Sequence, residues 1–184
     1  MKKVHAFDLN GLADPANLLL LRQVFTNPGA LKPGKTQAAI TEEVAGRFAR
    51  LAGGMAGRGI PPQQAAHFLM KLMFCMFAED IDLLPRGLFA RTVANARGDP
   101  ARLSRLLKTL FESMARGEPF GADDILRFNG GLFADSDTLD LTREEIDELG
   151  EAARCDWSSV EPTIFGTLFE RTLDPRRLPT TAHA

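Results

Sequence analysis

The chain has 184 residues, of which 45% are hydrophobic and 25% charged, the composition of an average soluble protein built as one ordinary domain. A chain of this length can bury a core without disulfides or metals. It carries 22 Lys and Arg against 24 Asp and Glu, and this net charge of −2 excludes a protein whose whole surface binds nucleic acid. A local basic face is compatible with it.

Cysteine use and hydropathy indicate a soluble, cytoplasmic protein. Cys75 and Cys155 lie far apart and outside any paired motif, so neither a disulfide framework nor a cysteine-type zinc site is indicated. No apolar segment follows the basic N-terminus, which argues against a secretory signal. The longest apolar run, residues 68–78, includes Lys71 and falls well short of the ~20 residues of a membrane helix.

The N-terminal third predicts two helices separated by a loop. Asp14-Pro15 has the form of an N-cap followed by proline at the first helical position, and Asn27-Pro28 ends that helix. Residues 27–36 are rich in Gly and Pro and predict a loop. Thr41 is expected to cap the second helix, whose apolar positions are Val44, Phe48, Leu51 and Met55.

The third helix is expected to be the centre of the fold. Pro61-Pro62 opens it, and Pro85 ends it. Residues 68–77 are apolar on nearly every face, which is typical of a helix surrounded by others. A short apolar segment follows, with Leu88, Phe89 and Val93.

Capping signals mark two further helices. Asp99-Pro100 starts a helix that Gly117 ends. Its amphipathic stripe consists of Leu103, Leu106, Leu107, Leu110, Phe111 and Met114. Thr142 and Glu145 form a capping box for a helix that continues through Ala153.

Two regions follow other patterns. In residues 126–134, Asn129-Gly130 lies between apolar residues and predicts a short β-hairpin or turn. A final helix is expected from near Pro162, with Ile164, Phe165, Leu168 and Phe169 buried. The tail after Asp174-Pro175 has no apolar period and is expected to be disordered.

These elements predict a mainly α fold, a single multi-helix bundle-like domain. An N-terminal helix and loop occupy residues 1–35, and the helical domain proper occupies residues 36–175. Residues 176–184 form the tail.

One segment matches a nucleotide-binding pattern. Residues 29–36, GALKPGKT, fit the phosphate-loop pattern G-x-x-x-x-G-K-[ST]. A working loop of this kind follows a buried strand, whereas Thr-Asn-Pro precedes Gly29, and Pro33 removes one of the N–H groups that cradle phosphate. The segment is interpreted as a Gly/Pro turn with an exposed lysine.

Acidic and aromatic residues offer further candidates. Glu79, Asp80 and Asp82 are expected to be structural, with one acid accepting hydrogen bonds from a neighbouring helix N-terminus or an arginine and the others facing water. The three histidines, His5, His67 and His183, have no ligand-like spacing. Trp157 is expected to lie in an N-terminal cap region, where its indole packs and its N–H finds an acceptor.

Arg102, Arg105 and Lys108 form a basic stripe opposite the leucines of their predicted helix. Such a stripe can bind phosphates without recognising base sequence, and Arg91 adds to the local positive potential. The alternative is an ordinary solvated helix face. These four residues are the candidate nucleic-acid contacts.

Three ordered segments resemble one protein family. They are FLMKLMFCMFAEDIDLLP (68–85), RFNGGLFAD (127–135) and DWSSVEPTIFGTLFERTLDPRR (156–177). Together they resemble the helical spacer of large site-specific DNA methyltransferases, which include fused type II restriction–modification enzymes and their nuclease-free relatives. The resemblance covers about residues 40 to 180, and the three segments are specific in combination.

The family resemblance implies a bacterial, cytoplasmic parent enzyme that transfers a methyl group from S-adenosylmethionine to adenine N6 in DNA. The methyltransferase domain of the family opens with a Gly-Ala-His-Tyr-Thr segment, from which the TTAHA of residues 180–184 departs. This chain contains no Asn-Pro-Pro-Tyr-like motif, no Phe-x-Gly-x-Gly loop and no Pro-Asp…Glu-x-Lys cluster. No catalytic, cofactor-binding or metal residues are therefore expected in it.

The expected function is that of a non-catalytic helical scaffold. It would position a covalently linked methyltransferase domain and touch the DNA backbone, with S-adenosylmethionine bound outside this chain and a fused endonuclease left open. The alternative is a stand-alone helical protein-interaction domain.

Overall fold

The computed structural model describes residues 11, 14–15, 17–18, 22, 36–128, 131–161, 163 and 166. The chain divides into two units, residues 1–36 and 37–184, and the elements below belong to the second. Apart from isolated positions, four expected features lie outside the described residues: the helix after Asp14, the phosphate-loop pattern, the helix after Pro162 and the C-terminal tail.

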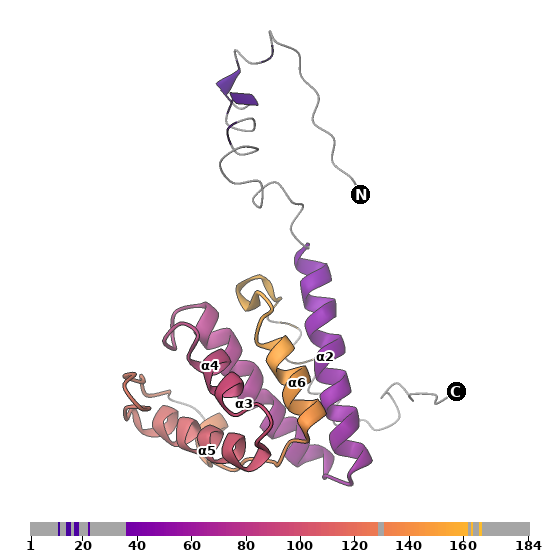
Figure 1. The fold of residues 1–184 in the computed structure, drawn as a ribbon, viewed down its shortest axis with the longest axis vertical. Coiled ribbons are helices and arrows are strands. Elements are labelled where there is room, and N and C mark those ends of the chain that lie inside the picture. The colour runs from indigo at the N-terminus through magenta and orange to yellow at the C-terminus, as the bar shows by residue number, and fades with distance from the viewer. Residues whose placement is uncertain are drawn as a thin grey trace, which may run out of the picture. The chain divides into compact units, whose positions relative to one another are not determined.

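Five helices build the described part of the second unit (Figure 1). They are α2 (Gln37–Gly57), α3 (Pro62–Asp80), α4 (Leu88–Asn95), α5 (Pro100–Arg116) and α6 (Arg143–Ala152). Two short 3-10 turns, η3 (Gly131–Phe133) and η4 (Trp157–Ser159), complete the elements. The prediction of a mainly α fold is confirmed, and none of the described helices is long and apolar enough to cross a membrane.

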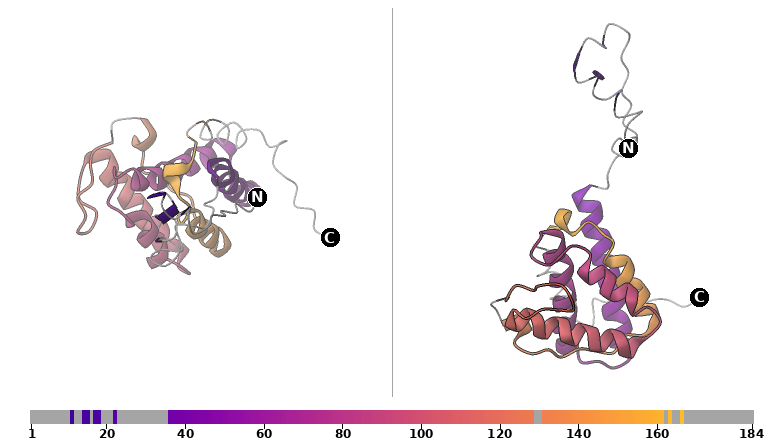
Figure 2. Two further views of the ribbon diagram at one scale, coloured as in Figure 1. Left: turned by 90° about the horizontal axis from the view of Figure 1, so that it is seen from above. Right: turned by 60° about the vertical axis from the view of Figure 1, so that its left-hand side comes forward.

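Helix α3 is the centre of the unit, as its all-round apolar pattern predicts. It packs against α2, α4, η3 and η4, and Figure 2 gives two further views of this arrangement. Eleven of its 19 residues are buried, and they include Phe68, Leu69, Leu72, Met73, Cys75 and Met76. The other helices bury one face each against this core.

The start of α2 corrects one sequence prediction. Val44, Phe48, Leu51 and Met55 are buried as expected, but the helix begins at Gln37, so Thr41 is not its N-cap. The preceding Gln37-Ala-Ala-Ile are compatible with helix, and nothing local stops the helix from extending upstream. The Thr41 hydroxyl instead accepts a hydrogen bond from the backbone N–H of Glu161, at 3.2 Å.

Helix ends follow local capping chemistry in most places. The Asp99 side chain accepts from the Arg102 N–H, and Gly117 ends α5 with a left-handed φ of 75°. Thr142 and Glu145 form the expected capping box of α6. By contrast α3 ends at Asp80, well before Pro85, because the chain turns back through Asp82 at a φ of 60°.

In the segment 126–134, none of the described residues belongs to a strand, and residues 131–133 form η3; Asn129 and Gly130, on which the hairpin prediction rests, lie outside the described residues. The ring of Phe74 on α3 lies 5.3 Å from that of Phe128 and 5.5 Å from that of Phe133, so both rings pack on the core.

Candidate nucleic-acid interface

Helix α5 presents the basic stripe, Arg102, Arg105 and Lys108, to solvent. All three side chains are exposed, while the opposite face of the helix buries Leu103, Leu107, Leu110, Phe111 and Met114. The helix carries a fourth basic residue, Arg116, and its single acid is Glu112. This helix is therefore strongly basic within a chain whose net charge is −2.

The three stripe side chains have no ion-pair partner among the described residues. Arg91, the fourth candidate, is placed differently on α4. Its guanidinium donates to the backbone carbonyl of Arg86 at 2.8 Å and lies 3.4 Å from the Asp123 carboxylate. Arg91 is thus held by partners, whereas the stripe is free to meet an external anion.

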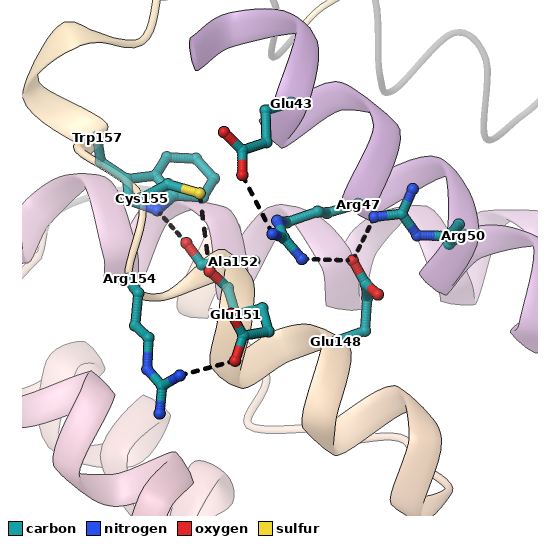
Figure 3. Close-up of polar contacts among 9 residues, drawn as sticks. All are labelled: Glu43, Arg47, Arg50, Glu148, Glu151, Ala152, Arg154, Cys155 and Trp157. Atoms are coloured by element: carbon teal, nitrogen blue, oxygen red, sulfur yellow. Dashed lines mark hydrogen bonds and ion pairs between the residues drawn. The ribbon is translucent and has the colours of Figure 1, made fainter. Parts of the chain in front are cut away.

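Arginines between α2 and α6 are paired with carboxylates (Figure 3). We call this contact, made by Glu43, Arg47, Arg50 and Glu148, the seam. Arg47 bonds Glu43 at 3.1 Å and Glu148 at 3.0 Å, and Arg50 bonds the same Glu148 oxygen at 2.6 Å. Burial opposes ionisation of Glu148, but the bonds and charges of Arg50 and Arg47 outweigh it and lower its pKa.

Residues 134–141, which we call the strap, join η3 to α6 and bond to several helices on the way. Its end Leu141 and the preceding Phe133 are buried, while polar groups make the contacts between them. Ser136 donates to the Glu112 carboxylate at 3.1 Å, and the Thr138 hydroxyl lies 2.9 Å from that of Ser104. The strap is therefore attached to α5 at two points.

A buried lysine attaches the strap to α3. The Lys71 side chain is fully buried, and its ammonium donates to the Asp135 carboxylate and to the carbonyls of Asp135 and Asp137, at 2.5, 3.0 and 3.3 Å. The hydrogen bond from Lys71 is the main cause of the lowered pKa of Asp135. His67 bonds the other Asp135 oxygen at 3.0 Å. These hydrogen bonds therefore attach the strap to α3.

The acidic run after α3 is structural, as predicted. Glu79 accepts from the Phe89 N–H at the start of α4, at 2.6 Å, and burial raises its pKa despite the bonds from this helix N-terminus. Asp82 pairs with Arg86 on the surface. Asp80 differs from the expectation of a solvent-facing acid, because its carboxylate accepts a hydrogen bond from the backbone N–H of Trp157 at 2.6 Å.

Trp157 lies in a cap region, as the sequence predicts. Its side chain is buried, and its indole N–H donates to the Ala152 carbonyl at 2.9 Å (Figure 3). Its ring packs edge-on against Phe48, with centroids 5.8 Å apart. The Asp80 and Trp157 contacts tie two of the family-like segments together.

No three His, Cys, Asp or Glu side chains converge on a metal-sized site within the part of the chain that the structure describes. The polar contacts of Lys71 with Asp135 and of Ser136 with Glu112 were not predicted from the sequence. A lone lysine inside the apolar run of α3 is a usable signal, because buried ammonium groups need oxygen partners. Nothing in the sequence identifies which oxygens those are.

Comparison with known proteins identifies the central segment. Residues 63–133 match the family model described as the MmeI helicase spacer domain. They extend from the first turn of α3 to the end of η3 and include the whole of α5. This part of the chain is similar to the helical spacer domain of the MmeI type, which confirms the resemblance that the ordered segments indicate.

A characterised relative agrees with that assignment. Over 112 residues, 56% of this chain, the sequence is 31% identical to DNA methyltransferase A of Bacillus subtilis (strain 168). The matched part is 12% of the length of that relative. No solved structure matches the chain. The chain is thus a helical domain of the kind associated with DNA methyltransferases.

Proposed function

We propose that this chain is the non-catalytic helical scaffold of an S-adenosylmethionine-dependent, site-specific DNA methyltransferase that modifies adenine N6. The observation that carries the proposal is the spacer-domain match over α3 to η3. S-adenosylmethionine binds to a covalently linked methyltransferase domain outside this chain. The similarity to a DNA methyltransferase supports that link.

The packing of the domain suits a scaffold. Most residues of α3 are buried. The ion pair between Lys71 and Asp135 attaches the strap to this helix, and the seam joins α2 to α6. Cores packed at this level deform little, so such a block keeps neighbouring parts of a protein at a fixed separation. Replacing residues 63–133 of the parent protein by a flexible linker should lower DNA methylation and leave S-adenosylmethionine affinity unchanged.

Mass spectrometry of nucleosides tests the chemistry. Duplex DNA incubated with S-adenosylmethionine and the complete parent protein should contain N6-methyladenine, and methylcytosine in its place would contradict the proposed base. The 184-residue chain in the same assay should leave the DNA unmodified. Methyl transfer by the chain itself, abolished by a substitution within it, would contradict the scaffold role.

The basic stripe is the proposed contact with the DNA backbone. Its three cations have no ion-pair partner among the described residues and can neutralise phosphates, whereas the one aromatic residue of α5, Phe111, is buried. At net −2 the chain should bind duplex DNA weakly, with affinity that falls as salt rises. Contacts of this kind with phosphates add affinity without sequence preference.

Fluorescence anisotropy with a labelled duplex tests this contact. Replacing Arg102, Arg105 and Lys108 by Ala should reduce the slope of log affinity against log salt by about 0.9 per lost phosphate contact. The matched control replaces Arg50, Arg97 and Arg154, which are exposed but paired with Glu148, Asp147 and Glu151. The control has the same net charge, so equal losses in both variants would assign the binding to net charge alone.

A further inference from the structure

We propose that Ser136 on the strap is a positioning residue that keeps the basic surface of α5 available to phosphates by holding Glu112 away from it. This inference rests on the proposed DNA contact of α5. It assigns to the strap a role in that contact, in addition to its attachment to α3.

The position of Glu112 on α5 makes it a natural partner for two cations. Lys108 precedes it by four residues and Arg116 follows it by four, the spacing at which oppositely charged side chains meet on a helix. A Glu placed four residues before a basic residue is the favoured order. An isolated α5 would therefore pair its one acid with its own cations.

The structure contains neither of these pairs. Among the described residues, the Glu112 carboxylate has one bonded partner, the Ser136 hydroxyl, at 3.1 Å, and Lys108 has none. Arg116 lies 3.7 Å from Glu118 instead. The strap thus binds the acid that could otherwise pair with Lys108 or Arg116.

The strap can hold Glu112 because it is itself fixed. Lys71 binds three of its oxygens from inside the core, and Ser104 bonds Thr138 two residues beyond Ser136. The Ser136 hydroxyl is therefore presented to Glu112 at a defined place. A hydroxyl donor satisfies the carboxylate without adding a charge that phosphates would meet.

Anisotropy titrations of the 184-residue chain over a salt series test the proposal. Ser136→Ala frees Glu112 to pair with Lys108 or Arg116, so the salt slope should fall by about 0.9, one phosphate contact. Glu112→Gln should bind at least as well as the unmodified chain. In the double variant Ser136→Ala/Glu112→Gln, the loss should disappear, because no carboxylate remains to be released.

Ser104→Ala is the matched control, because it removes the other bond between strap and α5 without freeing an acid. Binding by this variant should be unchanged. Equal weakening by Ser104→Ala and Ser136→Ala, or a loss that Glu112→Gln fails to rescue, would show that strap docking matters rather than Glu112. If the stripe variant loses binding while Ser136→Ala does not, this inference fails alone. If the unmodified chain shows no binding at low salt, the DNA contact and this inference fail together.

Discussion

The seam and the surface of α5 use basic residues in opposite ways. In the seam, Arg47 and Arg50 converge on Glu148, and Arg47 is mostly buried between two carboxylates. On α5, the stripe faces solvent with no ion-pair partner in the described residues, and the one acid of the helix, Glu112, accepts a hydrogen bond from the strap. Charge that is paired at a helix contact serves the fold, and charge left unpaired on one helix is available to a ligand.

Buried Lys71 extends the comparison to a third environment and gives the largest expected effect. Removing one partner of a buried pair leaves an uncompensated charge, whereas removing the charge itself does not. Asp135→Ala should therefore destabilise the domain by about 2 to 3 kcal/mol. This is less than for a fully buried pair, because the Asp135 side chain is partly exposed. Lys71→Met should lower the free energy of unfolding by less than Asp135→Ala does. Urea unfolding measures both, and a larger loss for Lys71→Met would contradict this account.

Two neighbouring glycines of α2, Gly53 and Gly54, test the role of Glu145 in the contact between α2 and α6. A Cβ on Gly54 would lie 2.7 Å from the Glu145 carboxylate, which holds the α6 capping box and bonds Arg58 at 2.7 Å. A Cβ on Gly53 meets nothing within 4 Å. Gly53→Ala should thus stabilise α2 by up to about 1 kcal/mol, and Gly54→Ala should destabilise by about 1 kcal/mol through the disturbed cap. Equal thermal shifts for the two variants would remove the proposed role of Glu145.

Glu148 provides the pH dependence of the seam. Its pKa is lower in the folded chain than in the unfolded chain, so its contribution to stability is present above the unfolded pKa and is lost as pH falls through the folded one. Glu148→Gln should cost about 1 kcal/mol at neutral pH and less in acid. Unfolding curves between neutral pH and about pH 3 should therefore converge for the two proteins. Parallel curves would show that Glu148 is not stabilised by its arginines.

Local signals account for what the sequence predicted correctly. Asp99, Gly117 and the Thr142–Glu145 box each determine a helix end from neighbouring residues, and the apolar spacing determines the faces of α3 and α5. Thr41 was wrong as a cap because capping residues also occur inside helices when the sequence upstream tolerates a helix.

Contacts between distant segments account for what the sequence did not predict. Lys71 and Asp135 lie 64 residues apart, and Ser136 and Glu112 lie 24 apart. Their pairing depends on how the strap crosses α3 and α5, which no local pattern encodes. The stripe residues were identified correctly as exposed, while their lack of partners, which separates them from Arg91 and from the seam, required the structure.

The smallest expected effect on stability belongs to the stripe, and it completes the comparison. Replacing Arg102, Arg105 and Lys108 by Ala removes no ion pair between described residues and places a good helix former at three exposed positions, so the free energy of unfolding should change by less than about 0.5 kcal/mol. The variant with Arg50, Arg97 and Arg154 replaced loses three ion pairs and should be less stable by about 1 kcal/mol. Chemical denaturation of both variants compares them at equal net charge. A stripe variant as destabilised as its control would mean that these side chains support the fold, and their exposure would then carry no argument for a nucleic-acid contact.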